Sequence, residues 1–312
     1  NLARLIKQSK SVNKPMNTVS APVTQVATTK PNHKRLALTK FKPALILLPF
    51  ALLFFMFQIA PMLWVLVNSF IYEEAFSFEN YQEIFDSAFI LQGFTNSLWL
   101  SITSSLVAIT IAACFVSSLR RFDSGLRDWI ISFTNMAANF SGVPLAFAFI
   151  IILGFNGALT LLLKRYGIID DFNLYGQWGL LAIYIYFQVP LAVLLLYPAF
   201  DALSDDWQAA SALLGAKTWQ FWRYIALPVL SPALLGTFII LIANAMGAYA
   251  SVYALTTGNY NVITVRIASL VSGDIFLEPN LAAAISVLLI LLLAFITIIN
   301  QLLIGRSYHA KR

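Results

Sequence analysis

Four uncharged amide side chains lie inside long apolar stretches of the sequence, where a polar group needs a hydrogen-bonding partner. Asn135 and Asn139 are four residues apart, so they share one face of a helix. Gln188 and Asn244 stand in two other apolar stretches. Amides in this setting hydrogen-bond either to a neighbouring helix or to a polar solute that passes between helices. We expect all four to face a solute pathway, with interhelical hydrogen bonding as the alternative.

A second group of residues follows the fourth apolar stretch, over residues 201–228. Apolar residues fall at helical spacing up to Gly215, and a second helical part is expected to end at Pro228, because the residue before a proline disfavours helix. Two short helices joined at a glycine form a projection whose apolar side chains need a partner, since the membrane cannot cover its outer face. The sequence therefore predicts a protein-docking loop. Its apolar residues include Leu213, Leu214, Phe221 and Ile225, with Gly215 between the two helices.

Catalytic and metal-binding chemistry is not indicated. The single cysteine, Cys114, excludes an internal disulfide framework and a multi-cysteine metal site. The two histidines, His33 and His309, lie in polar end segments. No nucleophile, base and orienting group occur in a recognisable pattern. We therefore expect no catalytic residue, no metal site and no cofactor bound by this chain.

The composition indicates whether the chain folds in water or in a membrane. Of 312 residues, 59% are apolar and 11% are charged, with a mean hydropathy of +0.77. Soluble domains average about 45–50% apolar and roughly 25% charged residues. A water-soluble globule and a disordered chain are both excluded. The sequence predicts an all-α polytopic membrane protein, with the lipid bilayer as a partner and no binding of nucleic acid.

Six apolar stretches are long enough to cross a bilayer, which needs roughly 20 residues in a helix. None of them contains Asp, Glu, Lys or Arg. Their approximate bounds are 43–70, 94–119, 129–155, 178–200, 229–255 and 281–304.

The distribution of basic residues predicts the orientation. All but three of the 20 Lys and Arg residues lie before the first span, after the second and fourth spans, or in the tail. Cytoplasmic segments retain positive charge, so both termini are expected in the cytoplasm. This organisation gives a flexible basic arm over 1–42, a six-span domain over 43–306 and a cytoplasmic tail over 307–312.

The segment AASALLGAKTWQFWRYIALP, residues 209–228, resembles the signature loop of inner-membrane permease subunits of binding-protein-dependent ABC importers. In that family a Glu-Ala-Ala triplet precedes Leu-Gly-Ala, and a proline follows the glycine at a fixed distance. Leu214, Gly215 and Ala216 match, and Pro228 has the family's spacing. The family's glutamate is absent, with Gln208 next to its position. The resemblance extends to the six spans and to the placement of the loop between spans four and five.

The resemblance implies the fold of a type I ABC importer permease in the bacterial inner membrane. It implies that the loop docks on a separate ABC ATPase, which binds ATP and magnesium. The expected contact residues are then Gln208, Ala209, Ala210, Leu213, Leu214, Gly215, Ala216, Phe221, Ile225 and Pro228. A second permease subunit, identical or related, and an external periplasmic solute-binding protein are the other implied partners. This chain has no Gly-Lys dipeptide, hence no GxxxxGK[ST] phosphate-binding loop, so we expect it not to be an enzyme.

An ion-coupled secondary carrier or a channel is the alternative function. Proton relays and voltage sensors place charged residues within the membrane, and the six predicted spans contain none. A sodium-coupled carrier that uses backbone carbonyls passes this test. The resemblance is to permeases of the polyamine, thiamine, ferric-iron and aminophosphonate group. The acidic outer segments favour a polyamine or related small amine as the first solute to consider.

Overall fold

The computed structural model of the chain describes residues 47–120, 122, 124–169, 172–273 and 277–309. The chain divides into two compact units between Gln58 and Ile59. The first unit contributes the helical residues 47–54 and most of a π-helical turn, Phe55–Ile59. The expected arm over 1–42 and the end of the expected tail, residues 310–312, lie outside the described residues.

Six described helices are long and apolar enough to cross a membrane, which confirms the predicted number of spans. The first, second, fourth and sixth correspond closely to the predicted stretches. The third and the fifth differ, because each of these two predicted stretches contains a break in the helix. The six candidate spans are Leu47–Asn68, Ala88–Leu119, Val143–Arg165, Gln177–Asp201, Thr218–Met246 and Pro279–Ile299.

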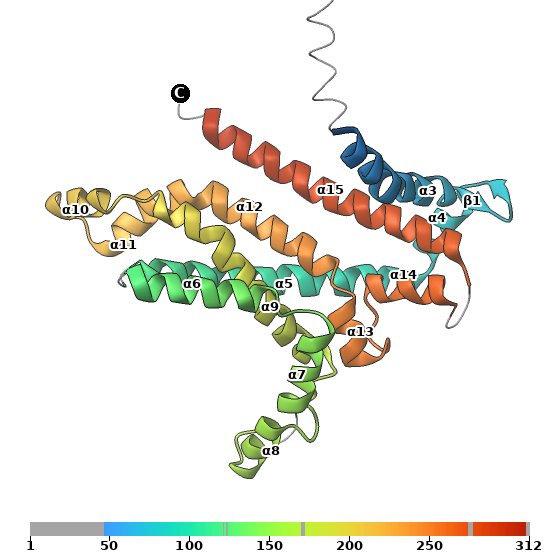
Figure 1. Cartoon of the computed structure of the whole chain (residues 1–312), viewed down its shortest axis with the longest axis horizontal. Helices are drawn as coiled ribbons and strands as arrows, with labels where there is room; N and C mark the ends of the chain where they lie inside the picture. The colour runs from blue at the N-terminus through green and yellow to red at the C-terminus, as the bar shows by residue number, and fades with distance from the viewer. Residues whose placement is uncertain (1–46, 121, 123, 170–171, 274–276, 310–312) are drawn as a thin grey trace, which may run out of the picture. The chain divides into compact units, whose positions relative to one another are not determined.

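The centre of the second unit consists of α5 (Ala88–Leu119), α9 (Gln177–Asp201) and α12 (Leu227–Met246), which pack against one another (Figure 1). The contact face of α5 carries small side chains such as Ala108 and Ala112, both fully buried. Small residues allow helix backbones to approach closely in a membrane, where van der Waals packing drives association.

The predicted third span is interrupted. Residues 129–155 are expected to form one helix, but the chain forms α6 (Ser124–Ala138) and then α7 (Val143–Leu153). Gly142, the N-cap residue of α7, has φ +72° and ψ −143°, a conformation that other residues rarely adopt. Pro144 then lies at the start of α7, where its missing N–H is not needed. A further helix, α8 (Ala158–Arg165), continues after α7.

The predicted fifth span begins earlier and ends earlier than expected. The prediction that Pro228 terminates the second loop helix is wrong, because α11 (Thr218–Phe221), the π-helical turn η2 (Trp222–Ala226) and α12 form one continuous helix. The backbone N–H of Leu227 bonds to the carbonyl of Trp222, five residues back. This π-type pattern shifts the hydrogen-bond register before Pro228, which then occupies the first turn of α12 without breaking the helix.

A second break follows α12. The helix ends at Met246, Gly247 caps it, and α13 (Ala250–Thr256) begins after two residues. The predicted span over 229–255 therefore consists of α12 and part of α13. The predicted stretches 129–155 and 229–255 are therefore both discontinuous, and α13 contacts α7.

A small antiparallel hairpin, β1 (Ile71–Tyr72) and β2 (Ala75–Phe76), follows the first span and was not predicted. Its two turn residues, Glu73 and Glu74, have positive φ, which is the backbone of a two-residue hairpin turn. The helix α4 (Glu79–Asp86) comes next.

The described C-terminal part consists of α14 (Ile263–Ser272) and α15 (Pro279–His309), which pack together. Ile84 of α4, Ile263 of α14 and Ile285 of α15 are fully buried in one cluster. This cluster joins α4 and α14 to the last candidate span.

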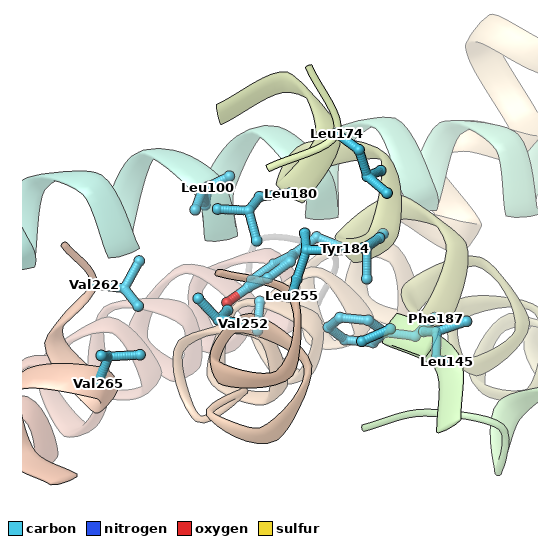
Figure 2. Close-up of a cluster of buried hydrophobic side chains, with 13 residues drawn as sticks. Leu100, Leu145, Leu174, Leu180, Tyr184, Phe187, Val252, Leu255, Val262 and Val265 are labelled. Atoms are coloured by element: carbon cyan, nitrogen blue, oxygen red, sulfur yellow. The ribbon is translucent and has the colours of Figure 1, made fainter. Parts of the chain in front are cut away.

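Tyr184 of α9 belongs to a buried cluster that joins α5, α7, α9 and α13. Figure 2 shows its ring with Leu180 of the same helix and Leu100 of α5 on one side, and Val252 and Leu255 of α13 near its hydroxyl. The hydroxyl donates a 3.3 Å hydrogen bond to the carbonyl oxygen of Ala248. The core therefore holds the break between α12 and α13 against α9.

Candidate functional site

The predicted docking loop begins with α10 (Asp205–Leu213), which lies with α11 at one end of α12 (Figure 1). The Ser204 hydroxyl accepts a 3.2 Å hydrogen bond from the backbone N–H of Asp206 and so caps the start of the helix. Three predicted contact residues, Gln208, Ala209 and Ala210, lie on α10 and are exposed.

Gly215 forms the turn after α10. Its φ of +79° lies in the left-handed region that favours glycine. The backbone N–H of Gly215 donates to the carbonyl of Ala212 at 2.9 Å, and that of Ala216 donates to the carbonyl of Ser211 at 3.0 Å. These are the two hydrogen bonds of a Schellman motif. The interruption expected at Gly215 is thus a structured turn.

Two adjacent leucines project from this turn. Leu213 is 90% exposed and Leu214 is 88% exposed. Both lie in the sequence between the fourth and fifth candidate spans. A groove of about 330 Å³ beside them is lined by Leu214, Gly215, Ala216, Gln220, Phe221, Tyr224 and Ile225. Exposed apolar side chains next to a groove are typical of a protein interface.

Other predicted loop residues face the spans. Phe221 is buried in a cluster with Phe200 and Leu203, at the end of α9. Ile225 packs against the same cluster, and the ring of Trp222 lies 6.3 Å from that of Phe200. Pro228 is exposed on the continuous helix. The loop therefore has an outward set, which is free for a partner, and an inward set, which fixes it to the bundle.

One inward contact was missed from the sequence. The guanidinium Nη2 of Arg120, at the end of α5, donates a 2.6 Å hydrogen bond to the carbonyl oxygen of Leu203. The loop after the second span and the loop after the fourth span therefore meet at the same end of the bundle. In the sequence, Arg120 contributes only to the distribution of basic residues that predicts the orientation. Nothing in the local pattern indicates a hydrogen-bond partner 83 residues away.

A pocket of about 500 Å³ lies where the two discontinuous spans meet. Asn244 of α12 lines it, as do Ser141 and Gly142 in the break between α6 and α7. The aromatic side chains in its wall are Phe187 and Tyr249. None of the lining residues is charged or carries an imidazole or thiol. They are Ala138, Ser141, Gly142, Phe187, Leu191, Asn244, Gly247, Ala248, Tyr249, Ala250 and Ser251.

The two breaks are joined by a direct hydrogen bond. Ser251 at the start of α13 donates through Oγ to the carbonyl oxygen of Gly142 at 3.3 Å. Non-helical backbone at membrane depth is tolerated where it is buried in protein or lines a polar cavity. The arrangement therefore offers backbone and side-chain hydrogen-bonding groups to a polar solute without placing a charge in the membrane.

The four predicted pathway residues do not come together. Asn135 and Asn139 are exposed, and Asn139 Nδ2 donates to the Asn135 carbonyl at 2.8 Å. Neither lines the pocket, although Ala138 and Ser141 on either side of Asn139 do. Asn244 alone of the four lines it.

Gln188 is fully buried between α9 and α5. Its Nε2 donates to Ser104 Oγ at 2.5 Å, and its Oε1 accepts from Ser105 Oγ at 2.8 Å. In this chain Gln188 therefore makes the interhelical hydrogen bonds that were the alternative to solute contact.

A cavity of about 430 Å³ near the hairpin has an acidic wall that includes Glu73, Glu83 and Glu278. Partial burial and then the neighbouring Glu278 carboxylate raise the pKa of Glu83 above its usual value. These acids lie on segments that the sequence assigns to the outer side.

Solved structures and curated proteins resemble this chain. A bacterial ABC transporter involved in the import of the acidic polysaccharide alginate has a chain of the same fold, with a TM-score of 0.69 and 17% identity over 86% of this chain and 98% of that one. The ferric transport system permease protein FbpB of Actinobacillus pleuropneumoniae is 25% identical over 264 residues, which are 84% of this chain and 38% of the relative. The thiamine transport system permease protein ThiP of Escherichia coli is 24% identical over 194 residues, 62% of this chain and 36% of the relative.

The chain thus spans well under half the length of these two curated relatives. The fold, with its six apolar helices and structured loop between the fourth and fifth, agrees with the resemblance found in the sequence. The matched region of the family model begins within α5 and extends into α15, so it includes both the loop and the pocket. Because residues 109–307 match the model described as binding-protein-dependent transport system inner membrane component, the chain belongs to this family of multi-pass inner-membrane proteins.

Proposed function

We propose that the chain is the permease subunit of an ATP-driven importer and forms half of the translocation pathway for a small solute. The observation that carries this proposal is the pair of exposed leucines, Leu213 and Leu214, on a structured loop that is fixed to the spans. A carrier that works alone has no use for an apolar projection of this kind. The chain is not itself the enzyme, since ATP hydrolysis belongs to the partner on which the loop docks.

The continuous helix from Thr218 to Met246 supports a direct coupling mechanism. Its 29 residues correspond to about 44 Å. One end carries Phe221 beside the docking groove, and the other carries Asn244 in the pocket wall. A displacement of the loop on an ATPase would move the pocket wall through a single rigid element. The two states would then be alternate positions of this helix, selected by nucleotide binding on the partner.

The other partners follow from the incomplete pathway. The pocket is lined by one side of each discontinuous span, so a second permease subunit, identical or related, would close it. An external periplasmic solute-binding protein would deliver the solute at the hairpin end. ATP and magnesium would be bound by the ATPase subunits only.

The orientation with both termini in the cytoplasm is supported by the contact of Arg120 with Leu203. This contact gathers two of the base-bearing loops at the end of the bundle that carries α10 and α11. Cytoplasmic segments retain positive charge, so this end would face the ATPase.

We retain a polyamine or related small amine as the first solute to test. The acidic cavity beside Glu83 and Glu278 would attract a cation to the outer end. The pocket itself is neutral and would bind through Asn244, Ser251 and backbone groups. Uptake of labelled spermidine into proteoliposomes that contain the complete transporter tests this choice. Uptake of thiamine or ferric iron, with none of spermidine, would reject it.

The docking role is tested by replacing Leu214 with Asp and co-purifying the chain with its partner ATPase. The side chain is 88% exposed, so folding should be unaffected while ATPase binding is lost. Leu277→Asp is the matched control, because this leucine is 70% exposed and lies on a segment that the sequence assigns to the outer side. Gly215→Asp should also abolish the association. Full ATPase binding and ATP-dependent uptake in Leu214→Asp would reject the docking role.

The secondary carrier is the alternative function, favoured by the uncharged polar pocket alone. Uptake that tracks a sodium gradient and persists without the ATPase would support it. Under our proposal, uptake requires ATP and is indifferent to that gradient.

A further inference from the structure

The short connection between α9 and α10, residues 202–204, is held from a third helix. Leu203 in this connection is buried, and its side chain belongs to the cluster that also contains Phe221. Among the described residues, no backbone N–H bonds to the Leu203 carbonyl oxygen. The donor is Arg120 Nη2, at the end of α5 and at 2.6 Å. The connection is therefore fixed both by a side chain and by its backbone.

The orientation of α10 depends on this connection. Of the α10 side chains whose burial is described, only that of Ser211 is buried. The helix is bounded by the connection at one end and by the turn at Gly215 at the other. Loss of the Arg120 guanidinium would leave the buried Leu203 carbonyl without a donor, which costs more than an exposed bond because water does not replace the donor there. Arg120 thus fixes the base of the docking helix to α5.

The other end of α5 is bonded to the segment between α13 and α14. Asn96 Nδ2 donates to the carbonyl oxygen of Asn261 at 2.9 Å. Ser97 Oγ accepts a hydrogen bond from the backbone N–H of Ile263, also at 2.9 Å. The 32 residues of α5 correspond to about 48 Å, with no glycine or proline after Ser97. One straight element therefore connects the base of α10 with a segment that the sequence assigns to the outer side.

We infer that Arg120 is a positioning residue for transport, whose bond to Leu203 makes α10 and α5 move as one body. A displacement of the docking loop then reaches the outer segment, residues 261–263, through α5. Rigid helices and hydrogen bonds of this kind carry coupling between distant sites. This route is additional to the one through α12 and the pocket wall. The inference rests on the proposed docking of the loop on an ATPase, and it assigns a second element through which nucleotide binding would control the outer end.

The native Cys114 provides the first test, because it is the single cysteine of the chain and is exposed on α5. Spin labels at Cys114 and at Ala212→Cys, an exposed position of α10, report the distance between the two helices by pulsed electron paramagnetic resonance. In the full chain we expect a narrow distance distribution. Addition of the ATPase and a non-hydrolysable ATP analogue should leave it unchanged, since the two helices move together.

Arg120→Gln should broaden this distribution and make it sensitive to nucleotide, and Arg120→Lys, which keeps a charged donor, should restore part of the narrow form. Arg223→Gln is the matched control, since Arg223 is an exposed base in the turn η2, beside the ring of Tyr224. Its distribution should equal that of the wild type. A purely structural role of Arg120 would lower the unfolding temperature but leave the distance in the folded protein unchanged.

The second test examines the outer end. In a Cys114→Ser background, Asn259→Cys places a thiol at an exposed position next to the outer segment. Its rate of reaction with a water-soluble maleimide should change severalfold when the ATPase and the ATP analogue are added. With Arg120→Gln in the same background, most of this change should be lost. ATPase binding itself should be retained, because Leu213 and Leu214 are untouched.

Two results would overturn the inference. A narrow distribution in Arg120→Gln, insensitive to nucleotide, would show that other contacts fix α10. A full nucleotide response of the maleimide rate in Arg120→Gln would show that the outer segment does not move through α5. Failure of the proposed function looks different, because the wild type would then not bind the ATPase. The route to the outer segment would fall with it, whereas the distance in the chain alone would still depend on Arg120.

Discussion

Ser251 Oγ donates a hydrogen bond to the carbonyl oxygen of Gly142 across 109 residues of sequence, at 3.3 Å. Each of the two residues stands next to a break in an apolar span. The bond therefore joins the third span to the fifth at the point where both leave the helical path. The pocket that Asn244 lines lies at this junction. The geometry of the junction depends on the backbone of Gly142.

Replacing Gly142 with Ala should lower the free energy of unfolding by about 1–3 kcal/mol, because its φ of +72° with ψ −143° is essentially restricted to glycine. Thermal unfolding in detergent measures the change, and solute uptake should fall with it. Gly236→Ala is the matched control. Gly236 lies within α12 with no atom within 4 Å of an added Cβ, so this change should stabilise the helix slightly. Equal effects of the two variants would contradict the role of Gly142.

The hydrogen bonds of Gln188 should couple α9 to α5. In a double-mutant cycle of Gln188→Leu and Ser105→Ala, we expect a coupling energy of about 0.6 kcal/mol and at most about 1.7 kcal/mol. Unfolding in mixed micelles measures the four variants. Ser132→Ala is the control partner, because the Ser132 hydroxyl bonds only to its own helix, at the Asp128 carbonyl. A coupling of zero with Ser105 would show that Gln188 is not the link between the helices.

Arg266 is expected to stabilise the segment between α13 and α14. Its Nε donates to Asn261 Oδ1 at 3.0 Å, its Nη2 donates to the Gly258 carbonyl at 3.2 Å, and its guanidinium lies 4.6 Å from the ring centroid of Phe89. Arg266→Lys keeps the charge but loses the fork, so unfolding should become easier by about 2 kcal/mol.

Limited proteolysis should then cut this segment faster, and Arg165→Lys should change neither measurement. If Arg266→Lys shows the proteolysis rate and the stability of the wild type, the positive charge alone is enough to stabilise the segment, and the two hydrogen bonds are not needed.

The raised pKa of Glu83 predicts a pH dependence of stability. A carboxyl group whose pKa is higher in the folded state binds more protons there than in the unfolded chain. Stability should therefore fall as pH rises from the usual glutamate pKa through the raised one. The effect should be modest, since the side chain stays exposed.

Glu83→Gln should flatten this part of the profile, as measured by thermal unfolding over a pH series. Glu278→Gln should do so partly, because Glu278 is the second cause of the shift after burial. Identical profiles in the wild type and Glu83→Gln would refute the assignment.

The number of spans and the turn between two helices at Gly215 were predictable from the sequence, because both depend on local patterns. An apolar stretch of about 20 residues crosses a bilayer wherever it stands in the chain. The turn at Gly215 was predictable for the same reason, since a glycine between two apolar helical patterns favours a left-handed turn. These features are independent of what lies across the bundle.

The tertiary structure alone decided which polar residues meet. Gln188 and Asn244 look alike in sequence, yet Gln188 is buried against Ser104 and Ser105 whereas Asn244 lines the pocket. Pro228 was expected to end a helix, but a π-helical turn before it keeps the helix continuous. Contacts such as those of Ser251 with Gly142 and of Arg120 with Leu203 join distant segments. Such pairings follow from how helices pack, and the periodicity of one helix carries no information about its neighbour's register.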